Sequence, residues 1–148
     1  MDRNEAFYKL MDMINTVSDK IVSYNKKPRQ YGTEDTLFVV EAHTIDKIGR
    51  DPDITVTQIA ENMYKTKGAV SQTIDRLIQK DLLERTVNPE DTRKNILTLT
   101  EKGQTVYTHH KEKDKLAYDR YLNRLEAYDE DDFEMCMDIL SKIFKIEK

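Results

Sequence analysis

The helical pattern in the stretch from Lys65 to Leu83 constrains the fold of this chain more than any other stretch. Its apolar residues recur at three- and four-residue spacing and therefore share one side of a helix. Thr66 stands where an N-cap is expected, because its hydroxyl can accept a hydrogen bond from a first-turn amide. Such a helix suits either an ordinary protein surface or insertion into the major groove of DNA. The apolar side is formed by Val70, Ile74, Leu77 and Ile78, and the polar side carries Gln72, Arg76 and Gln79.

A second short helix precedes this one closely. In the sequence ITVTQIAENM (residues 54–63), Thr55 and Gln58 have the spacing of a capping box. Only a brief turn, Tyr64 and Lys65, separates the two helices. Two short helices joined by so few residues predict a helix-turn-helix, in which the first helix braces the second and the second enters the groove. This neighbour favours the DNA-binding interpretation of the stretch from Lys65 to Leu83.

A β-hairpin is predicted immediately after the second helix. Residues 83–87 and 95–99 alternate apolar and polar side chains, as strands do. The connection between them, residues 88–94, is polar and turn-forming and ends in two adjacent cations, Arg93 and Lys94. Cations on such a wing can reach phosphate or the minor groove of DNA. The order helix-turn-helix then hairpin therefore predicts a winged helix.

Further amphipathic helices flank this unit. Residues 5–24 have a wide apolar face, and a second helix is expected over 33–49, with Thr33 as its cap. A long polar helix should begin after Thr100, and a last helix should follow the acidic break at residues 128–132. The predicted fold is therefore mainly α with a small β-hairpin wing.

Composition sets the broad class of the protein. The net charge of −4 does not exclude DNA binding, because residues 63–94 hold seven basic and five acidic residues, whereas residues 125–148 hold three and eight. So small a local excess predicts binding that weakens readily with salt. There is no membrane-length apolar run and no secretory signal, and the one cysteine, Cys136, excludes an internal disulfide. We expect a cytoplasmic protein in which Cys136 is a packed small residue.

The run from Ile54 to Gly103 resembles the MarR family of bacterial winged-helix transcription regulators. The resemblance is carried by ITVTQIAENM, by TKGAVSQTIDRLIQKDLLER (residues 66–85) and by NPEDTRKNILTLTEKG (residues 88–103). It implies a single domain over 1–148, with a winged helix at about 34–100 and dimerisation helices at about 2–25 and 101–147. It also implies a homodimer that binds a pseudo-palindromic operator, acts as a repressor and responds to a small-molecule effector.

The family pattern assigns DNA contacts to the second helix and the wing. Gln72 sits where many relatives place Arg, and Gln favours adenine over guanine. Asp91 would orient Arg93, although the alternative is a surface ion pair worth less than about 1 kcal/mol. The matching positions are Thr66, Lys67, Gly68, Ala69, Ser71, Gln72, Arg76, Asp91, Arg93 and Lys94.

Effector contacts are suggested by aromatic residues. Tyr8, Tyr24, Tyr31 and His43 could line a cleft between the dimer lobe and the winged helix, or they could be ordinary core residues. Residues 41–49 resemble the corresponding helix of family members that regulate fatty-acid synthesis. That resemblance favours an effector with an acyl chain.

Other function classes find less support. The sequence has no Gly-rich phosphate loop or nucleophile elbow, so we expect no enzyme, no cofactor and no metal. Metal sensing is one alternative, because His109 or His110 could join His43, but the two adjacent histidines face different sides of a helix. The other alternative is a protein-interaction module that retains the winged-helix fold without binding an operator.

Overall fold

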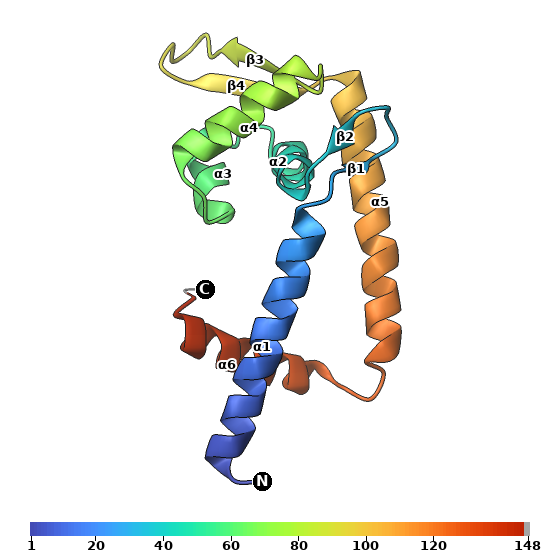
Figure 1. The fold of residues 1–148 in the computed structure, drawn as a ribbon. Helices are drawn as coiled ribbons and strands as arrows, with labels where there is room; N and C mark the ends of the chain where they lie inside the picture. Colours follow the sequence, from blue (N-terminus) through green and yellow to red (C-terminus); the bar gives the residue numbers. More distant parts are fainter. Residues whose placement is uncertain (147–148) are drawn as a thin grey trace. The chain divides into compact units, whose positions relative to one another are not determined.

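The computed structural model describes residues 1–146, and it divides into two compact units, Met1–Lys111 and Glu112–Lys148. Each unit is described by itself. The first contains the winged helix, and the second contains the C-terminal part of α5 and the last helix (Figure 1). The elements are α1 (Arg3–Asn25), β1 (Arg29–Gln30), β2 (Thr36–Leu37), α2 (Val39–Arg50), α3 (Val56–Asn62), α4 (Lys67–Gln79), β3 (Leu83–Val87), β4 (Asn95–Leu99), α5 (Glu101–Arg124) and α6 (Glu130–Phe144).

The predicted helix-turn-helix is confirmed as α3 and α4. At α3, the amide of Gln58 donates to Thr55 Oγ1 at 3.2 Å and the amide of Thr55 donates to Gln58 Oε1 at 2.9 Å, which is the capping box. At α4, Thr66 Oγ1 accepts from the amide of Ala69 at 3.1 Å. The apolar stripe of α4 is buried at Val70, Ile74 and Leu77 and partly buried at Ile78.

The predicted wing is confirmed with its boundaries unchanged. β3 and β4 pair antiparallel, with Leu83 opposite Leu99 and Val87 opposite Asn95. Leu83 and Leu97 are buried in the same core as the stripe of α4, whereas the outer end of the hairpin is exposed. The base of the wing is therefore fixed to the helix-turn-helix by burial.

The prediction of a helix that begins at Thr33 is wrong. β1 and β2 form a small antiparallel hairpin around Gly32, whose φ of +75° is the left-handed region that glycine favours. α2 starts only at Val39, where Glu41 Oε2 accepts from the amide of Phe38 at 2.8 Å. A cap from the third helical residue, which the sequence reading overlooked, replaces the expected cap from Thr33. The helix ends at Arg50, one residue beyond the predicted stop.

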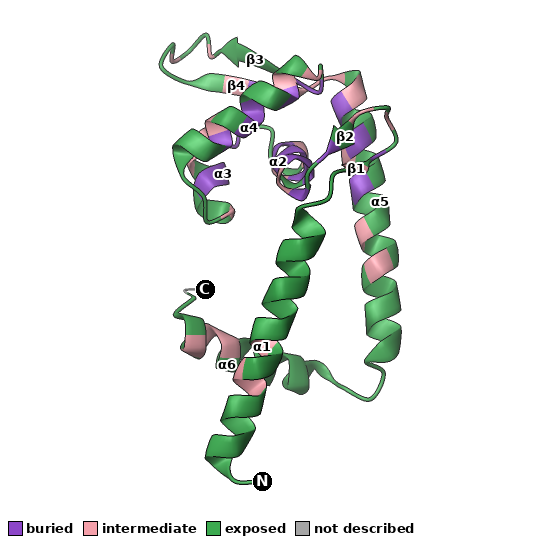
Figure 2. Ribbon diagram, viewed as in Figure 1, coloured by how far each residue is buried: buried purple, intermediate pink, exposed green. Residues whose placement is uncertain are grey.

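The terminal helices differ from the winged helix in burial. α1 and α6 contain no buried residue, and α5 is buried at Gly103, Val106 and His110, near its start (Figure 2). The expected last helix to residue 147 ends at Phe144, and residue 147 lies outside the described residues. Cys136 is exposed, contrary to the expectation of packing, because its helix buries none of its side chains. Among residues 1–146, the structure contains no helix with the length and apolar content to span a membrane.

Gly103 lets the start of α5 approach the turn between α4 and β3. Thr100 Oγ1 donates to the carbonyl of Asp81 at 2.7 Å, and Lys102 Nζ donates to the carbonyl of Lys80 at 2.9 Å. A Cβ atom added at Gly103 would lie 1.9 Å from the carbonyl oxygen of Leu82, which is too close for any side chain. The structure therefore gives this glycine a packing role.

We predict that Gly103→Ala destabilises the protein by about 1–3 kcal/mol, because backbone must shift to admit the methyl group. The measurement is urea denaturation at fixed protein concentration. Gly68→Ala is the matched control, since a Cβ there meets nothing within 4 Å and should add up to about 1 kcal/mol of stability. Equal stability of the Gly103 variant and the wild type would contradict the packing.

Candidate nucleic-acid interface

The exposed side of α4 has the composition that the sequence predicted. Lys67, Gly68, Ala69 and Gln72 are exposed, and Ser71 is half-buried. The start of the helix holds only small side chains beside Lys67, and the space around Gly68 is open to at least 4 Å. A helix N-terminus carries partial positive charge and free amide donors. This end of α4 can therefore approach an anionic backbone closely.

Arg76 is held more tightly than a surface arginine. Its Nη2 donates to Thr73 Oγ1 at 3.2 Å, and its Nε lies 3.8 Å from Glu41 Oε1. The side chain is still 52% exposed, so its outer end reaches solvent. The contact with Glu41 crosses from α2 to α4, and no local sequence pattern indicates it because the two residues are far apart along the chain.

The tip of the wing is ordered by Asp91. Asp91 Oδ1 accepts from the amide of Arg93 at 3.1 Å and from its Nε at 3.4 Å, and Oδ2 lies 4.0 Å from Lys94 Nζ. The Arg93 side chain is 91% exposed. The structure thus brings the predicted pair together and presents an arginine to solvent. Contact of either residue with DNA stays a prediction.

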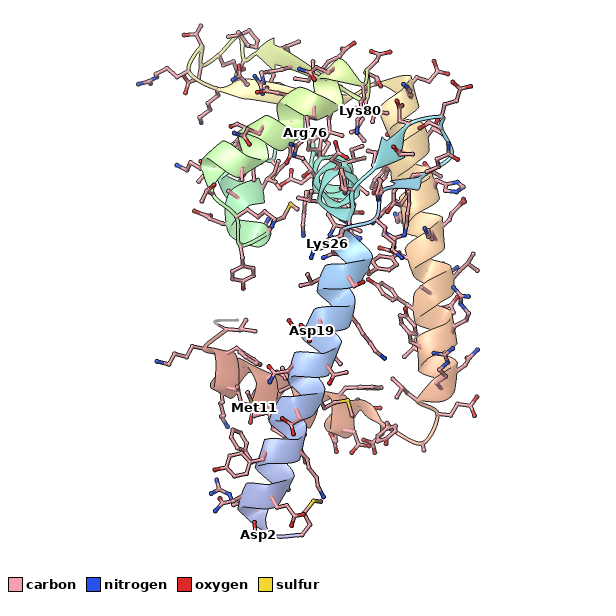
Figure 3. The ribbon with its side chains drawn as sticks, in the orientation of Figure 1. Asp2, Met11, Asp19, Lys26, Arg76 and Lys80 are labelled. Atoms are coloured by element: carbon pink, nitrogen blue, oxygen red, sulfur yellow. The ribbon has the colours of Figure 1, made fainter. Side chains whose placement is uncertain are left out.

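An ion pair also joins the wing to α4. Arg85 Nη2 lies 2.9 Å from Asp75 Oδ1, which links strand β3 to the exposed side of the helix. Sequence reasoning missed this pair, because neither Asp75 nor Arg85 is among the positions that the resemblance assigns to DNA contact. Together with the shared core, the pair makes α4 and the wing one surface with fixed spacing. Figure 3 shows the side chains that project from both elements.

The residues predicted to bind an effector are not all brought together. Tyr8 and Tyr24 lie on α1, sixteen residues and about 24 Å apart along the helix. The ring of Tyr24 stacks 3.5 Å below the Arg29 guanidinium, and both tyrosines are exposed. Tyr31 is buried, and its ring lies 5.7 Å from that of His110. Of the four residues, His43 lines a cleft.

That cleft has a volume of about 550 Å³ and is bounded by α2, α3 and the end of α1. Its apolar lining includes Phe38, Val40 and Met63, and two lysines, Lys47 and Lys65, also line it. A cleft with an apolar wall and cationic groups fits a ligand that is apolar in its body and acidic at one end. The remaining lining residues are Asn25, Val39, His43 and Asn62.

The histidines named in the sequence reading are partly grouped. The rings of His43 and His110 meet edge to face with centroids 5.4 Å apart, and His109 instead lies against Gly32. Among residues 1–146, no group of three or more His, Cys, Asp or Glu side chains is placed to hold a metal ion.

These elements define a winged helix-turn-helix with a polar, partly cationic outer face. Comparison with known proteins then identifies the family. Residues 39–94 match the model of the MarR family. The resemblance predicted from the sequence is thereby confirmed over this segment, which carries a MarR-family winged helix. This is a family of regulators and not of enzymes.

Individual relatives agree with this assignment. The uncharacterized HTH-type transcriptional regulator YhjH of Bacillus subtilis (strain 168) is 29% identical over 103 residues, covering 70% of this chain and 59% of that protein. Streptococcus pneumoniae FabT, solved in complex with DNA, is 25% identical, with a TM-score of 0.67 over 97% of this chain and 96% of its own. Adhesin competence repressor (AdcR) of Streptococcus pyogenes has a TM-score of 0.71 at 20% identity, over 93% and 94% of the two chains.

Proposed function

We propose that this protein is a homodimeric repressor that binds a pseudo-palindromic operator through α4 and the wing. The observation that carries the proposal is the ion pair between Asp75 and Arg85, at 2.9 Å, which couples the outer face of α4 to the wing. A rigid spacing between a groove-reading helix and a phosphate-reaching hairpin suits duplex DNA. The likeness to FabT, solved in complex with DNA, supports the same partner here.

The dimer is supported by the terminal helices. Neither α1 nor α6 buries any residue, although both carry large apolar side chains on one side. Apolar surface of this extent favours association, and a two-fold pair would present two copies of α4 to one duplex. The exposed apolar residues include Phe7, Val17 and Ile21 on α1, Leu116, Tyr121 and Leu122 on α5, and Phe133, Ile139 and Phe144 on α6.

Two single substitutions test DNA binding. Arg76→Ala should weaken binding to the promoter of its own gene by about 1–3 kcal/mol if the guanidinium touches a base. Arg93→Ala should weaken binding to all duplexes, because it removes a phosphate contact. The slope of log K against log salt concentration should fall in magnitude by about one for each subunit in contact with DNA. Both are measured by fluorescence anisotropy over a series of salt concentrations.

Arg120→Ala is the matched control for these variants. It removes the same charge from an exposed side chain on α5, whose Nε donates to the carbonyl of Leu116 in its own helix. Its affinity should equal that of the wild type. Should neither Arg76→Ala nor Arg93→Ala weaken binding at moderate salt, the interaction-module alternative replaces operator binding.

Selection from a randomised duplex pool tests the dimer and the role of Gln72 together. Wild-type protein should enrich a pseudo-palindrome with half-sites about one helical turn apart. Gln72→Arg should move the preference at one position of each half-site from adenine towards guanine, since Arg pairs bidentately with guanine. An unchanged preference removes Gln72 from the base contacts, and asymmetric single sites contradict the dimer.

We also propose that the effector is an amphipathic acid that binds in the cleft beside His43. The apolar wall of Phe38, Val40 and Met63 suits an acyl chain, and Lys47 and Lys65 suit a carboxylate. The acyl expectation from residues 41–49 agrees with this lining. The cleft adjoins the start of α2 and the helix-turn-helix, so a ligand there could alter the placement of α3 and α4.

Octanoate should raise the melting temperature of the protein and weaken its binding to DNA, whereas 1-octanol should do so less because it lacks the carboxylate. Lys47→Gln should reduce the octanoate response. The exposed Lys142 on α6 provides the control substitution, Lys142→Gln, which should respond as the wild type. Equal responses of the Lys47 variant and the wild type would exclude this cleft as the site.

A further inference from the structure

A single buried carboxylate connects α2 to the recognition helix. Glu41 is 1% exposed, and its Oε1 lies 2.9 Å from Lys80 Nζ and 3.8 Å from Arg76 Nε. Both cations belong to the C-terminal part of α4 and its cap, one helical turn apart (Figure 3). Glu41 is not among the residues that the family pattern assigns to DNA contact.

The carboxylate of Glu41 is paired with groups from two elements, the start of α2 and the C-terminal part of α4 with its cap. Oε2 accepts from the amide of Phe38, which begins α2, and Oε1 accepts from Lys80. Lys80 Nζ also donates to the carbonyl of Thr36 on β2, at 3.0 Å. Burial of a charge is unfavourable unless it is paired and hydrogen-bonded, so this arrangement has one preferred geometry. That geometry fixes where α4 lies against α2.

The same carboxylate also lies beside the Nε edge of the Arg76 guanidinium. A guanidinium has five N–H donors, and here Nε faces Glu41 while one N–H of Nη2 donates to Thr73 Oγ1. The outer edge, formed by Nη1 and the second N–H of Nη2, remains for a ligand. This edge is a pair of parallel donors of the kind that binds guanine or phosphate bidentately. Thr73 is itself fixed, because its hydroxyl donates to the carbonyl of Ala69 at 3.0 Å.

We propose that Glu41 is the positioning residue for Arg76 in DNA recognition, an inference that rests on the proposed function. Glu41 touches no DNA; with Thr73 it limits the conformations of the arginine before DNA arrives. A restrained side chain loses less conformational entropy on binding than a free one. The anchor therefore strengthens binding to the preferred sequence.

A positioning role and a purely electrostatic role of Glu41 predict opposite changes in DNA affinity when its charge is removed. Removal of a negative charge close to α4 would by itself strengthen binding to every duplex. Loss of positioning instead weakens binding to the preferred duplex only. The ratio of affinities for preferred and scrambled duplexes separates the two effects, and a merely structural role would lower the melting temperature without changing that ratio.

The experiment uses the full chain with Glu41→Gln, which keeps the shape and the hydrogen bond to Phe38 but removes the charge. The probes are the duplex enriched by wild-type protein from a random pool and a scrambled duplex of equal length. We expect the affinity ratio to fall about two- to tenfold per restrained arginine, the range for ordering one long side chain. Asp46→Asn is the matched control, since Asp46 is also buried on α2 but pairs with Arg50 of its own helix at 2.8 Å.

Two further measurements make the outcome decisive. In an Arg76→Ala background, Glu41→Gln should leave the affinity ratio unchanged, because the residue it positions is gone. The Nε–Hε NMR signal of Arg76 in the free protein should move in Glu41→Gln and stay in Asp46→Asn. If Glu41→Gln does not fold, Thr73→Val, which removes the other anchor, should lower the ratio in the same direction.

The proposal is overturned if Glu41→Gln leaves the affinity ratio at the wild-type value, or lowers it equally with and without Arg76. It is also overturned if the Arg76 signal is insensitive to Glu41. A wild-type protein that enriches no sequence overturns the proposed function, and the positioning role with it, even where the NMR signal confirms the contact. The two failures are therefore distinguishable.

Discussion

Burial of the apolar stripe of α4 is the constraint on which the interface depends. Val70, Ile74 and Leu77 are each at most 2% exposed, and they pack in one core with α2, α3 and the base of the wing. Because a helix has only one such side, fixing the stripe also fixes the direction of Gln72 and its polar neighbours. The polar side chains on this side of α4 thus need no contact of their own to face outward.

Polar contacts further restrict the position of α4. The core sets the orientation of α4 about its axis. Glu41 and the Asp75–Arg85 pair, which both contact the C-terminal part of the helix or its cap, restrict how it slides or tilts. Gly103 adds a third restraint by bringing α5 against the carbonyl of Leu82. Each restraint acts on the backbone or a charged group, so together they define a single position for a helix whose apolar contacts alone would tolerate small shifts.

Local signals in the sequence predicted the local structure well. The capping box at Thr55, the cap at Thr66 and both strands of the wing depend on residues a few positions apart, and all are confirmed. The helix expected from Thr33 failed because its real start depends on Glu41. The contact of that carboxylate with Lys80 joins residues 39 positions apart, and no periodic pattern encodes such a pair. The lining of the candidate effector cleft was not predicted for the same reason, since it comes from three separate segments of the chain.

The pairing of charges also explains how an acidic chain suits a selective DNA-binding role. Of the seven cations in residues 63–94, five lie within 4.0 Å of a carboxylate, so their attraction for phosphate is partly cancelled. Non-specific binding, which depends on unpaired positive charge, should be weak for such a surface. Affinity must then come from a few groups held in defined positions, and Arg76 and Arg93 are both held by a carboxylate while keeping exposed ends. In the proposed DNA-binding role, internal pairing would lower general attraction to phosphate and favour sequence discrimination.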